Sequence, residues 1–171
     1  MRFRQLSLFT LACLPFLIFV PQGAHAVRQD NLILSSAVDG QLFDHGKPVA
    51  GQKMIRTLHW NMEEEPRTEI TTTNKDGRFQ FPEVRGAAEF GFLAKLFHVP
   101  NVSIRIYVPV KDLNYMAYAN SRNSYKENVE TGLPLIRMKC DLKNSQMFDE
   151  ILPVIDCEVE KSQERKNLKY D

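Results

Sequence analysis

Hydrophobic and polar residues alternate along much of this chain, which is the spacing typical of β-strands. The clearest run is 102–108, where four aliphatic residues alternate with polar or amphipathic ones, and the run 53–60 places Met54, Leu58 and Trp60 on one side. Because successive side chains of a strand point to opposite faces of a sheet, both runs predict strands with one buried face.

Turn-forming residues divide the segment 38–81 into short strands. His45 to Pro48 combines a glycine with a proline, and Asn74 to Gly77 predicts a tight hairpin turn in which Gly77 adopts a positive φ. The phenylalanines at the second and fourth positions after this turn face the same side of the next strand. Short strands with frequent turns predict an all-β fold, most simply a sandwich.

One segment changes to a helical spacing. Residues 87–98 place apolar side chains at positions i, i+3, i+4 and i+7 and stop before a proline, which predicts one short helix. The residues of this apolar stripe are Phe90, Leu93, Ala94 and Phe97.

Three polar stretches have no regular period. Residues 62–67 form a loop with an acidic run, 120–131 is expected to be a long loop, and 161–171 is a charged tail that we expect to fray. A strand over 112–119, which carries two tyrosines, is expected before the long loop.

The first 26 residues have the form of a secretion signal. Two arginines precede an apolar run from Leu6 to Val20, which is too short to cross a bilayer comfortably, and an Ala-x-Ala cleavage motif ends at Ala26. We therefore expect residues 1–26 to be a signal peptide and the mature protein to be periplasmic. An uncleaved anchor and a lipoprotein acylated at Cys13 are the less favoured alternatives.

Removal of the signal peptide leaves 145 of the 171 residues, which is the length of one ordinary domain. We expect a sandwich domain over 27–160, followed by the tail over 161–171. The 22 basic residues fall to 20 against 21 acidic ones, so the formal net charge changes from +1 to −1. A net charge this close to zero does not favour binding to nucleic acid or to an anionic membrane.

The cysteine content agrees with an oxidising compartment. Loss of the signal peptide leaves Cys140 and Cys157, each on the apolar face of an alternating segment. We expect both side chains to point inward from neighbouring strands, where a disulfide would contribute about 3 kcal/mol by restricting the unfolded chain. Two buried free thiols or a metal pair are the alternatives, although the pair has no histidine nearby.

The turn chemistry of the segment 38–81 resembles that of transthyretin-like (prealbumin-like) and carboxypeptidase regulatory-like β-sandwiches. The matching motifs are Val38-Asp39-Gly40-Gln41-Leu42, Gly46-Lys47-Pro48-Val49-Ala50-Gly51 and Thr73 to Phe81. The resemblance implies a transthyretin-like or Ig-like β-sandwich. It implies little about function, because this fold serves many roles.

The rest of the domain resembles a narrower group of small exported bacterial proteins. The similarity rests on Arg56 to Trp60, on the helix expected over Phe90 to Phe97, and on Met138-Lys139-Cys140-Asp141-Leu142 with a final cysteine. That group is linked to immunity proteins of type VI secretion systems, which bind a toxic effector and block it. The resemblance implies a protein partner and assigns no functional residue.

No catalytic, metal or cofactor motif stands out in the sequence. His45, His59 and His98 lie far apart and outside any metal-binding spacing, and the serines lack a nucleophile-elbow setting. Transthyretin-like hydrolases end in Tyr-Arg-Gly-Ser, whereas this chain ends in Leu-Lys-Tyr-Asp. We therefore expect a non-enzymatic protein without a cofactor.

Candidate binding residues are an acidic run and several aromatic side chains, which are residue types that suit a basic partner and protein interfaces. Each also has a structural alternative, because acidic runs often form solvated loop tips, a lone tryptophan often fills a core, and tyrosines often flank a sheet edge. The apolar stripe of the expected helix more often closes one end of a sandwich. The candidates are Trp60, Glu63, Glu64, Glu65, Tyr115, Tyr118 and Tyr125.

The leading hypothesis is a periplasmic immunity-type protein that blocks a toxic effector by occlusion. Its interface is expected in the 61–67 loop and in the segment 111–132. A structural module of a periplasmic or surface assembly is the second hypothesis. A transthyretin-like small-molecule carrier or hydrolase is the third, and it would require a polar pocket or channel.

Overall fold

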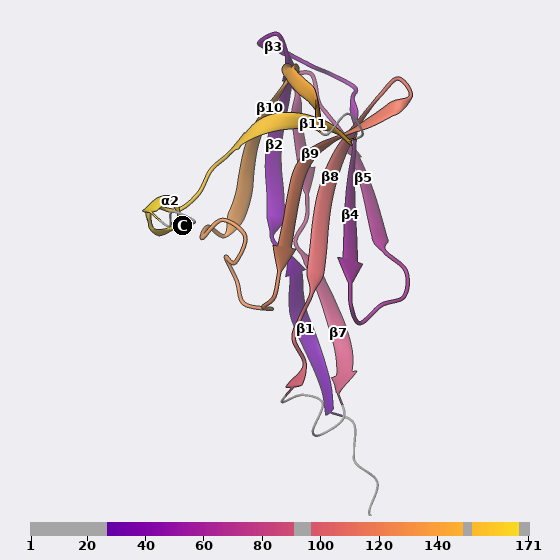
Figure 1. Cartoon of the computed structure of the whole chain (residues 1–171), viewed down its shortest axis with the longest axis vertical. Helices are drawn as coiled ribbons and strands as arrows, with labels where there is room; N and C mark the ends of the chain where they lie inside the picture. The colour runs from indigo at the N-terminus through magenta and orange to yellow at the C-terminus, as the bar shows by residue number, and fades with distance from the viewer. Residues whose placement is uncertain (1–26, 91–96, 149–151, 168–171) are drawn as a thin grey trace, which may run out of the picture.

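The computed structural model describes residues 27–90, 97–148 and 152–167, and it consists of strands with one five-residue helix. The all-β class predicted from the alternating pattern is confirmed (Figure 1). The elements are β1 (Val27–Ser35), β2 (Ala37–Asp44), β3 (Lys47–Pro48), β4 (Lys53–Trp60), β5 (Arg67–Thr72), β6 (Arg78–Phe81), β7 (Val84–Phe90), β8 (Val102–Val110), β9 (Leu113–Arg122), β10 (Leu135–Phe148), β11 (Leu152–Val159) and α2 (Gln163–Asn167).

One large sheet forms the body of the domain. Its strand order is β3-β2-β10-β11-β9-β8-β4-β5, and β6 also pairs with β2. β2 pairs with β10 in parallel, and so does β9 with β11. The β9–β11 pairing consists of one pair of residues, Met116 and Val154. The sheet curls, so that the β2–β10 side and the β8–β4 side share one hydrophobic core.

The alternation along β4 and β8 has the consequence predicted from sequence. Met54, Leu58 and Trp60 are buried, and so are the four aliphatic residues of 102–108. Arg56 occupies the same face of β4 and is fully buried as well. The strand period therefore places a charged group in the core.

A two-stranded ribbon extends the body at one end. β1 pairs with β7 in antiparallel fashion, and each continues a strand of the body, since β1 leads into β2 and β6 leads into β7. The breaks lie at Ser36 and at the Pro82–Glu83 step. Figure 1 shows β1 and β7 projecting beyond the other strands.

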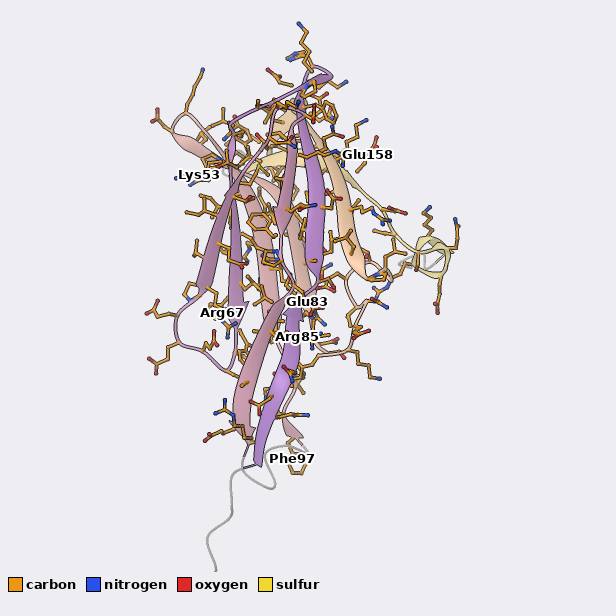
Figure 2. The ribbon with its side chains drawn as sticks, turned by 180° about the vertical axis from the view of Figure 1, so that it is seen from behind. Lys53, Arg67, Glu83, Arg85, Phe97 and Glu158 are labelled. Atoms are coloured by element: carbon orange, nitrogen blue, oxygen red, sulfur yellow. A yellow bond between two sulfur atoms is a disulfide. The ribbon has the colours of Figure 1, made fainter. Side chains whose placement is uncertain are left out.

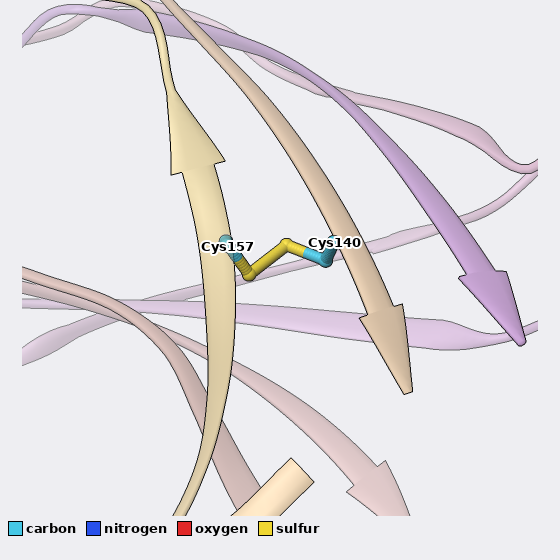
Figure 3. The surroundings of a disulfide bond; sticks show 2 residues. All are labelled: Cys140 and Cys157. Carbon is cyan, nitrogen blue, oxygen red and sulfur yellow. A yellow bond between two sulfur atoms is a disulfide. The ribbon is translucent and has the colours of Figure 1, made fainter. Parts of the chain in front are cut away.

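The expected disulfide is present between β10 and β11. Cys140 and Cys157 are directly opposite each other in the ladder, with their Cα atoms 4.4 Å apart, and their sulfur atoms are bonded (Figure 3). Their position on the inner faces of adjacent strands confirms the pairing inferred from the alternating pattern.

The turn at 74–77 forms as predicted, but it does not join two paired strands. Gly77 has a φ of 73°, and a Cβ there would lie 2.4 Å from the carbonyl oxygen of Leu42, so glycine is required. β5 pairs with β4, whereas β6 pairs with β2. The turn therefore carries the chain from one side of the curled sheet to the other, and the expectation of a hairpin was wrong.

The helix predicted over 87–98 is only partly within the described residues. Residues 87–90 belong to β7, where Phe90 is buried, so the prediction of a helix was wrong for these residues. Residues 91–96, which include Leu93 and Ala94, lie outside the described residues, and Phe97 is helical but 79% exposed. Phe90 and Phe97 therefore do not form one buried stripe.

The long polar loop begins later than predicted, and part of the charged tail packs against it. β9 continues to Arg122, so the loop begins at 123. The backbone N–H of Ser162 donates to Thr131 at 2.9 Å, and an Arg165 Nη2 donates to the carbonyl of Val129 at 2.5 Å. The first part of the expected frayed tail therefore packs against this loop, while 168–171 lie outside the described residues.

Candidate functional site

Three connecting segments meet at one end of the sheet. Trp60 ends β4 and pairs with Val102 at the start of β8, which pairs with Arg122 at the end of β9. The segments attached to these residues, 61–66, 97–101 and 123–134, therefore leave the sheet at the same end. We call this region the loop end, and it brings together two stretches in which the sequence predicted an interface.

A cluster of aromatic side chains joins two of these segments to the core. The indole Nε1–H of Trp60 donates to the hydroxyl of Tyr125 at 2.9 Å, and the same hydroxyl lies 2.8 Å from Nε2 of His98. The His98 ring stacks on Tyr125 at a centroid distance of 6.0 Å and contacts the Phe90 ring at 4.8 Å. The Tyr125 hydroxyl is thus the point at which the 97–101 and 123–134 segments meet.

Hydrogen bonds near both of its ends hold the 61–66 loop in place. The side-chain amide of Asn61 donates to the carbonyl of Val99 at 3.1 Å, and the backbone N–H of Asn61 donates to Asn101 at 3.0 Å. Further along, the Glu63 carboxylate accepts Nε of Arg67 at 2.8 Å, and Arg67 also donates to the carbonyl of Arg85 on β7 at 2.9 Å. Figure 2 labels Arg67 and Arg85 on these neighbouring elements.

A buried ion pair holds the 123–134 loop from inside. The Arg122 and Glu130 side chains are fully buried, and the guanidinium donates to the carboxylate at 2.9 Å. Arg122 also donates to the carbonyls of Ser124 at 3.0 Å and Lys126 at 2.5 Å. The loop therefore wraps around the guanidinium that it neutralises.

The same carboxylate reaches the break between β1 and β2. Glu130 accepts the backbone N–H of Ser36 at 2.9 Å and its hydroxyl at 2.8 Å. On the other side of this break, Arg56 donates to Glu69 at 2.7 Å and to the carbonyl of Pro82 at 2.7 Å. Arg56 also donates to the carbonyl of Ser36 at 3.5 Å, so a series of polar contacts runs from β5 through the core to the loop end.

Burial determines how the pKa values of the two arginines in this series of polar contacts are shifted. Burial lowers the pKa of Arg56 and of Arg122, and the carboxylates of Glu69 and Glu130 oppose that effect. At the surface the cause is different, because the hydrogen bond from Arg67 lowers the pKa of Glu63 despite its partial burial. The buried pairs are therefore held against a desolvation penalty that the surface pair largely avoids.

The exposed part of the loop end combines apolar and acidic side chains. Met62 is 38% exposed and Val99 is 66% exposed, and the Asn61 contacts bring their segments side by side. Glu64 and Glu65 are exposed in the same loop. Figure 2 shows Phe97 near the far ends of β1 and β7. An apolar surface bordered by carboxylates is a surface that a basic, partly apolar partner would complement.

The structure separates the predicted binding residues into three groups. Glu64 and Glu65 are exposed at the loop end, whereas Glu63 is paired with Arg67. Trp60 is 2% exposed and fills the core, as its structural alternative proposed, so its ring offers no binding surface. Tyr125 is half-buried and contributes by positioning the loop end.

The remaining two tyrosines lie away from the loop end or inside the core. Tyr115 lies toward the opposite end of β9 and packs against the core, and Tyr118 is buried. Burial, reinforced by the Glu130 carboxylate, raises the pKa of Tyr118. Its hydroxyl has no hydrogen-bond partner within the part of the chain that the structure describes. Tyr118 therefore exposes little side-chain surface to a partner.

Sequence reasoning missed Arg56, Arg122 and Glu130. A signal existed for Arg56, because the alternation that buries Met54 and Leu58 buries it too. Arg122 and Glu130 lay in a stretch without a period, and nothing in that stretch indicated burial. Glu130 also accepts hydrogen bonds from Ser36, which is distant in sequence.

The described surface carries several clefts with volumes near those of small-molecule sites, between about 380 and 540 Å³. A cleft of about 440 Å³ lies between β9 and β11 and includes Tyr118 and Asp156 in its lining. Another, of about 410 Å³, lies over β2, β10 and β11, where Arg137 and Glu160 are ion-paired at 3.3 Å. Among residues 27–90, 97–148 and 152–167, no three histidine, cysteine or acidic side chains are grouped as a metal site. No helix in this part of the chain is long and apolar enough to cross a membrane.

Comparison with known proteins identifies a family. No curated protein sequence matches the chain. A solved structure described as "Trapped Toxin" is similar at 8% sequence identity with a TM-score of 0.24, over 72% of this chain and 23% of that one, which is too low a score to support an argument. The family match covers residues 38–145, from β2 into β10. The chain therefore belongs to the family described as Domain of unknown function (DUF6795).

Proposed function

We propose that this protein is a periplasmic, non-enzymatic immunity-type inhibitor that binds a toxic effector through its loop end and blocks it by occlusion. The observation that carries the proposal is the arrangement of the three connecting segments around the Tyr125 hydroxyl. They present Met62, Val99 and the exposed carboxylates of Glu64 and Glu65 on one surface. We expect a toxic effector as the partner of this surface because the sequence resembles exported proteins linked to type VI secretion immunity.

Occlusion requires loops that are already ordered before the partner arrives. The Arg122–Glu130 ion pair, the Asn61 contacts and the Trp60–Tyr125 hydrogen bond each restrict one of the three segments. Loops that are preorganised lose less conformational entropy on binding, so a modest interface binds more tightly. The carboxylates of Glu64 and Glu65 would accelerate association with a basic cleft.

Two experiments test the proposal. The first compares a strain that lacks this gene with its parent in competition against sibling cells that deliver toxins, and the deletion strain should be killed. The second captures partners from the periplasm with the tagged mature protein and with a Glu64→Lys/Glu65→Lys/Val99→Asp variant. The variant should lose the effector that the unaltered protein retains.

A matched control is available at the opposite end of the sheet. Asp112→Lys reverses a charge in the exposed β8–β9 turn and should leave capture of the effector unchanged. Full resistance of the deletion strain to every sibling toxin would refute the immunity function. Constitutive recovery of a large periplasmic or surface assembly, without a toxin, would favour the structural-module hypothesis instead.

A further inference from the structure

β5 is a strand with one open side. Within the described part of the chain it pairs with β4 and ends the order of the large sheet. Figure 1 shows β5 at the margin of the molecule, beside β4. An unpaired edge exposes a row of backbone N–H and C=O groups that can pair with another strand.

The ladder identifies which backbone groups face outward. The N–H of Thr73 donates to the carbonyl of Gln52 at 2.9 Å, and this pair continues the β4–β5 register. Because alternate residues of an antiparallel strand point their backbone groups toward the same neighbour, Thr71 and Glu69 face β4. Thr68, Ile70 and Thr72 therefore direct their N–H and C=O groups to the open side.

This edge lacks several of the features that normally protect an edge strand, and the two charged residues on its inner face, Arg67 and Glu69, are ion-paired with Glu63 and Arg56. Proteins protect edges with proline, lysine, bulges or very short strands. β5 is six residues long, contains neither proline nor lysine, and has a regular register with β4. Its outward side chains are Thr68, Ile70 and Thr72, and Ile70 is 59% exposed. All three are β-branched residues, which favour strands.

The sequence of β5 is complementary to itself around Ile70. In an antiparallel pair of two β5 strands centred on this residue, Ile70 lies opposite Ile70 of the second copy and Thr68 lies opposite Thr72. On the inner face, Glu69 lies opposite Thr71, so no like charges meet. Apolar and hydroxyl pairs directly opposite each other stabilise a sheet. We propose that two copies of this protein pair through β5 and form one continuous sheet across a twofold axis.

The proposal has a specific covalent test. Residues opposite each other in a hydrogen-bonded pair have Cα atoms about 5.5 Å apart, which a disulfide can bridge. Ile70→Cys should therefore form an intermolecular disulfide readily on mild oxidation of the mature protein, whose native cysteines are already bonded to each other. Thr72→Cys is the matched control, because the two copies of residue 72 would lie about 14 Å apart and should not crosslink.

A second test measures association without new thiols. Sedimentation equilibrium of the unaltered mature protein should show a dimer, and Ile70→Lys, which places two like charges at the twofold axis, should weaken dimerisation at least tenfold. His59→Lys adds the same charge at an exposed position on the neighbouring strand β4 and should leave association unchanged.

Several results would overturn the dimer. A monomer at all accessible concentrations, or equal crosslinking of Ile70→Cys and Thr72→Cys, excludes it. A monomer whose Ile70→Lys variant loses a captured partner would assign the open edge to that partner. The dimer does not depend on the immunity function, since it rests on the outward residues Thr68, Ile70 and Thr72 of β5, which are not part of the loop end, and the tests use the isolated protein.

Discussion

Two loops of the loop end are each held by an arginine–glutamate ion pair, but one pair is buried and the other is partly exposed. The 123–134 loop is held from inside by Arg122 and Glu130, whose side chains are fully buried. The 61–66 loop is held from outside by Glu63 and Arg67, whose side chains are 30% and 34% exposed. Both loops are polar in sequence, and in each a glutamate of the loop pairs with the arginine of an adjoining strand, yet the surroundings of the pairs differ.

The difference decides how each loop responds to loss of its pair. A buried charge without its partner cannot recruit water, so the folded state is strongly destabilised. An exposed charge is solvated as soon as its partner is removed, so the effect is small. We therefore expect the 123–134 loop to unfold only with the domain, whereas the 61–66 loop can adjust locally.

The largest effect is expected from Glu130→Ala. This change leaves the buried Arg122 guanidinium without its carboxylate and removes both contacts to Ser36. The free energy of unfolding, measured by urea denaturation followed by circular dichroism, should fall by about 3–5 kcal/mol. The double variant Arg122→Met/Glu130→Leu should recover part of this loss. A single variant as stable as the parent would show that the pair is not buried in solution.

Removal of the disulfide provides a reference that involves neither loop. Cys140→Ala/Cys157→Ala opens a bridge between residues 17 apart in sequence. By the chain-entropy relation, the free energy of unfolding should fall by about 3 kcal/mol. The same denaturation measurement should give a similar loss for the parent under reducing conditions. A change in the relative stability of the two loops would mean that β10–β11 is coupled to them.

A smaller effect is expected from Tyr125→Phe. It leaves the buried indole N–H of Trp60 without its acceptor and removes the contact to His98. Loss of an acceptor for a buried donor should lower the free energy of unfolding by about 1–2 kcal/mol. Tyr115→Phe, at the opposite end of β9, is the matched control and should change stability less. If both variants lowered the free energy of unfolding equally, Tyr125 would not be the common anchor of these segments.

The smallest effect is expected from Glu63→Gln, and it should depend on pH. Because the folded-state pKa of Glu63 is lowered, its stabilisation is present above the ordinary glutamate pKa of about 4.3 and is lost as the pH falls through the folded-state value. Partial exposure limits the loss at pH 7 to about 1 kcal/mol or less. The parent and variant should converge in thermal denaturation as the pH falls from about 4.3 through the lowered folded-state pKa. A difference that grows toward acid pH would contradict this assignment.

The sequence was informative wherever local chemistry decides the structure. Alternation predicted the buried faces of β4 and β8, and the requirement for glycine at 77 predicted its turn. The two cysteines on inward faces predicted the disulfide. Each of these features depends on residues within one strand or one turn, or on two adjacent strands.

The pairing of segments that lie far apart in the chain could not be predicted from the sequence. The pairing of β6 with β2, instead of with β5, depends on how the whole sheet curls. The buried carboxylate of Glu130 depends on Ser36, at a sequence separation of 94 residues. Residues 120–131 were predicted to be a long loop because they are polar and have no regular period. Neither feature indicates that Arg122 and Glu130 are buried within this stretch.

The hydrogen bond between Trp60 and Tyr125 also provides an optical reporter. Trp60 is the single tryptophan of the chain, so its fluorescence reports one site without labelling. Its indole is buried and lies edge-on to the Tyr125 ring at a centroid distance of 6.0 Å. An effector that displaces Tyr125 would change the polarity around the indole and shift its emission. Binding at the loop end can therefore be followed by titrating an effector without tryptophan into the unmodified protein.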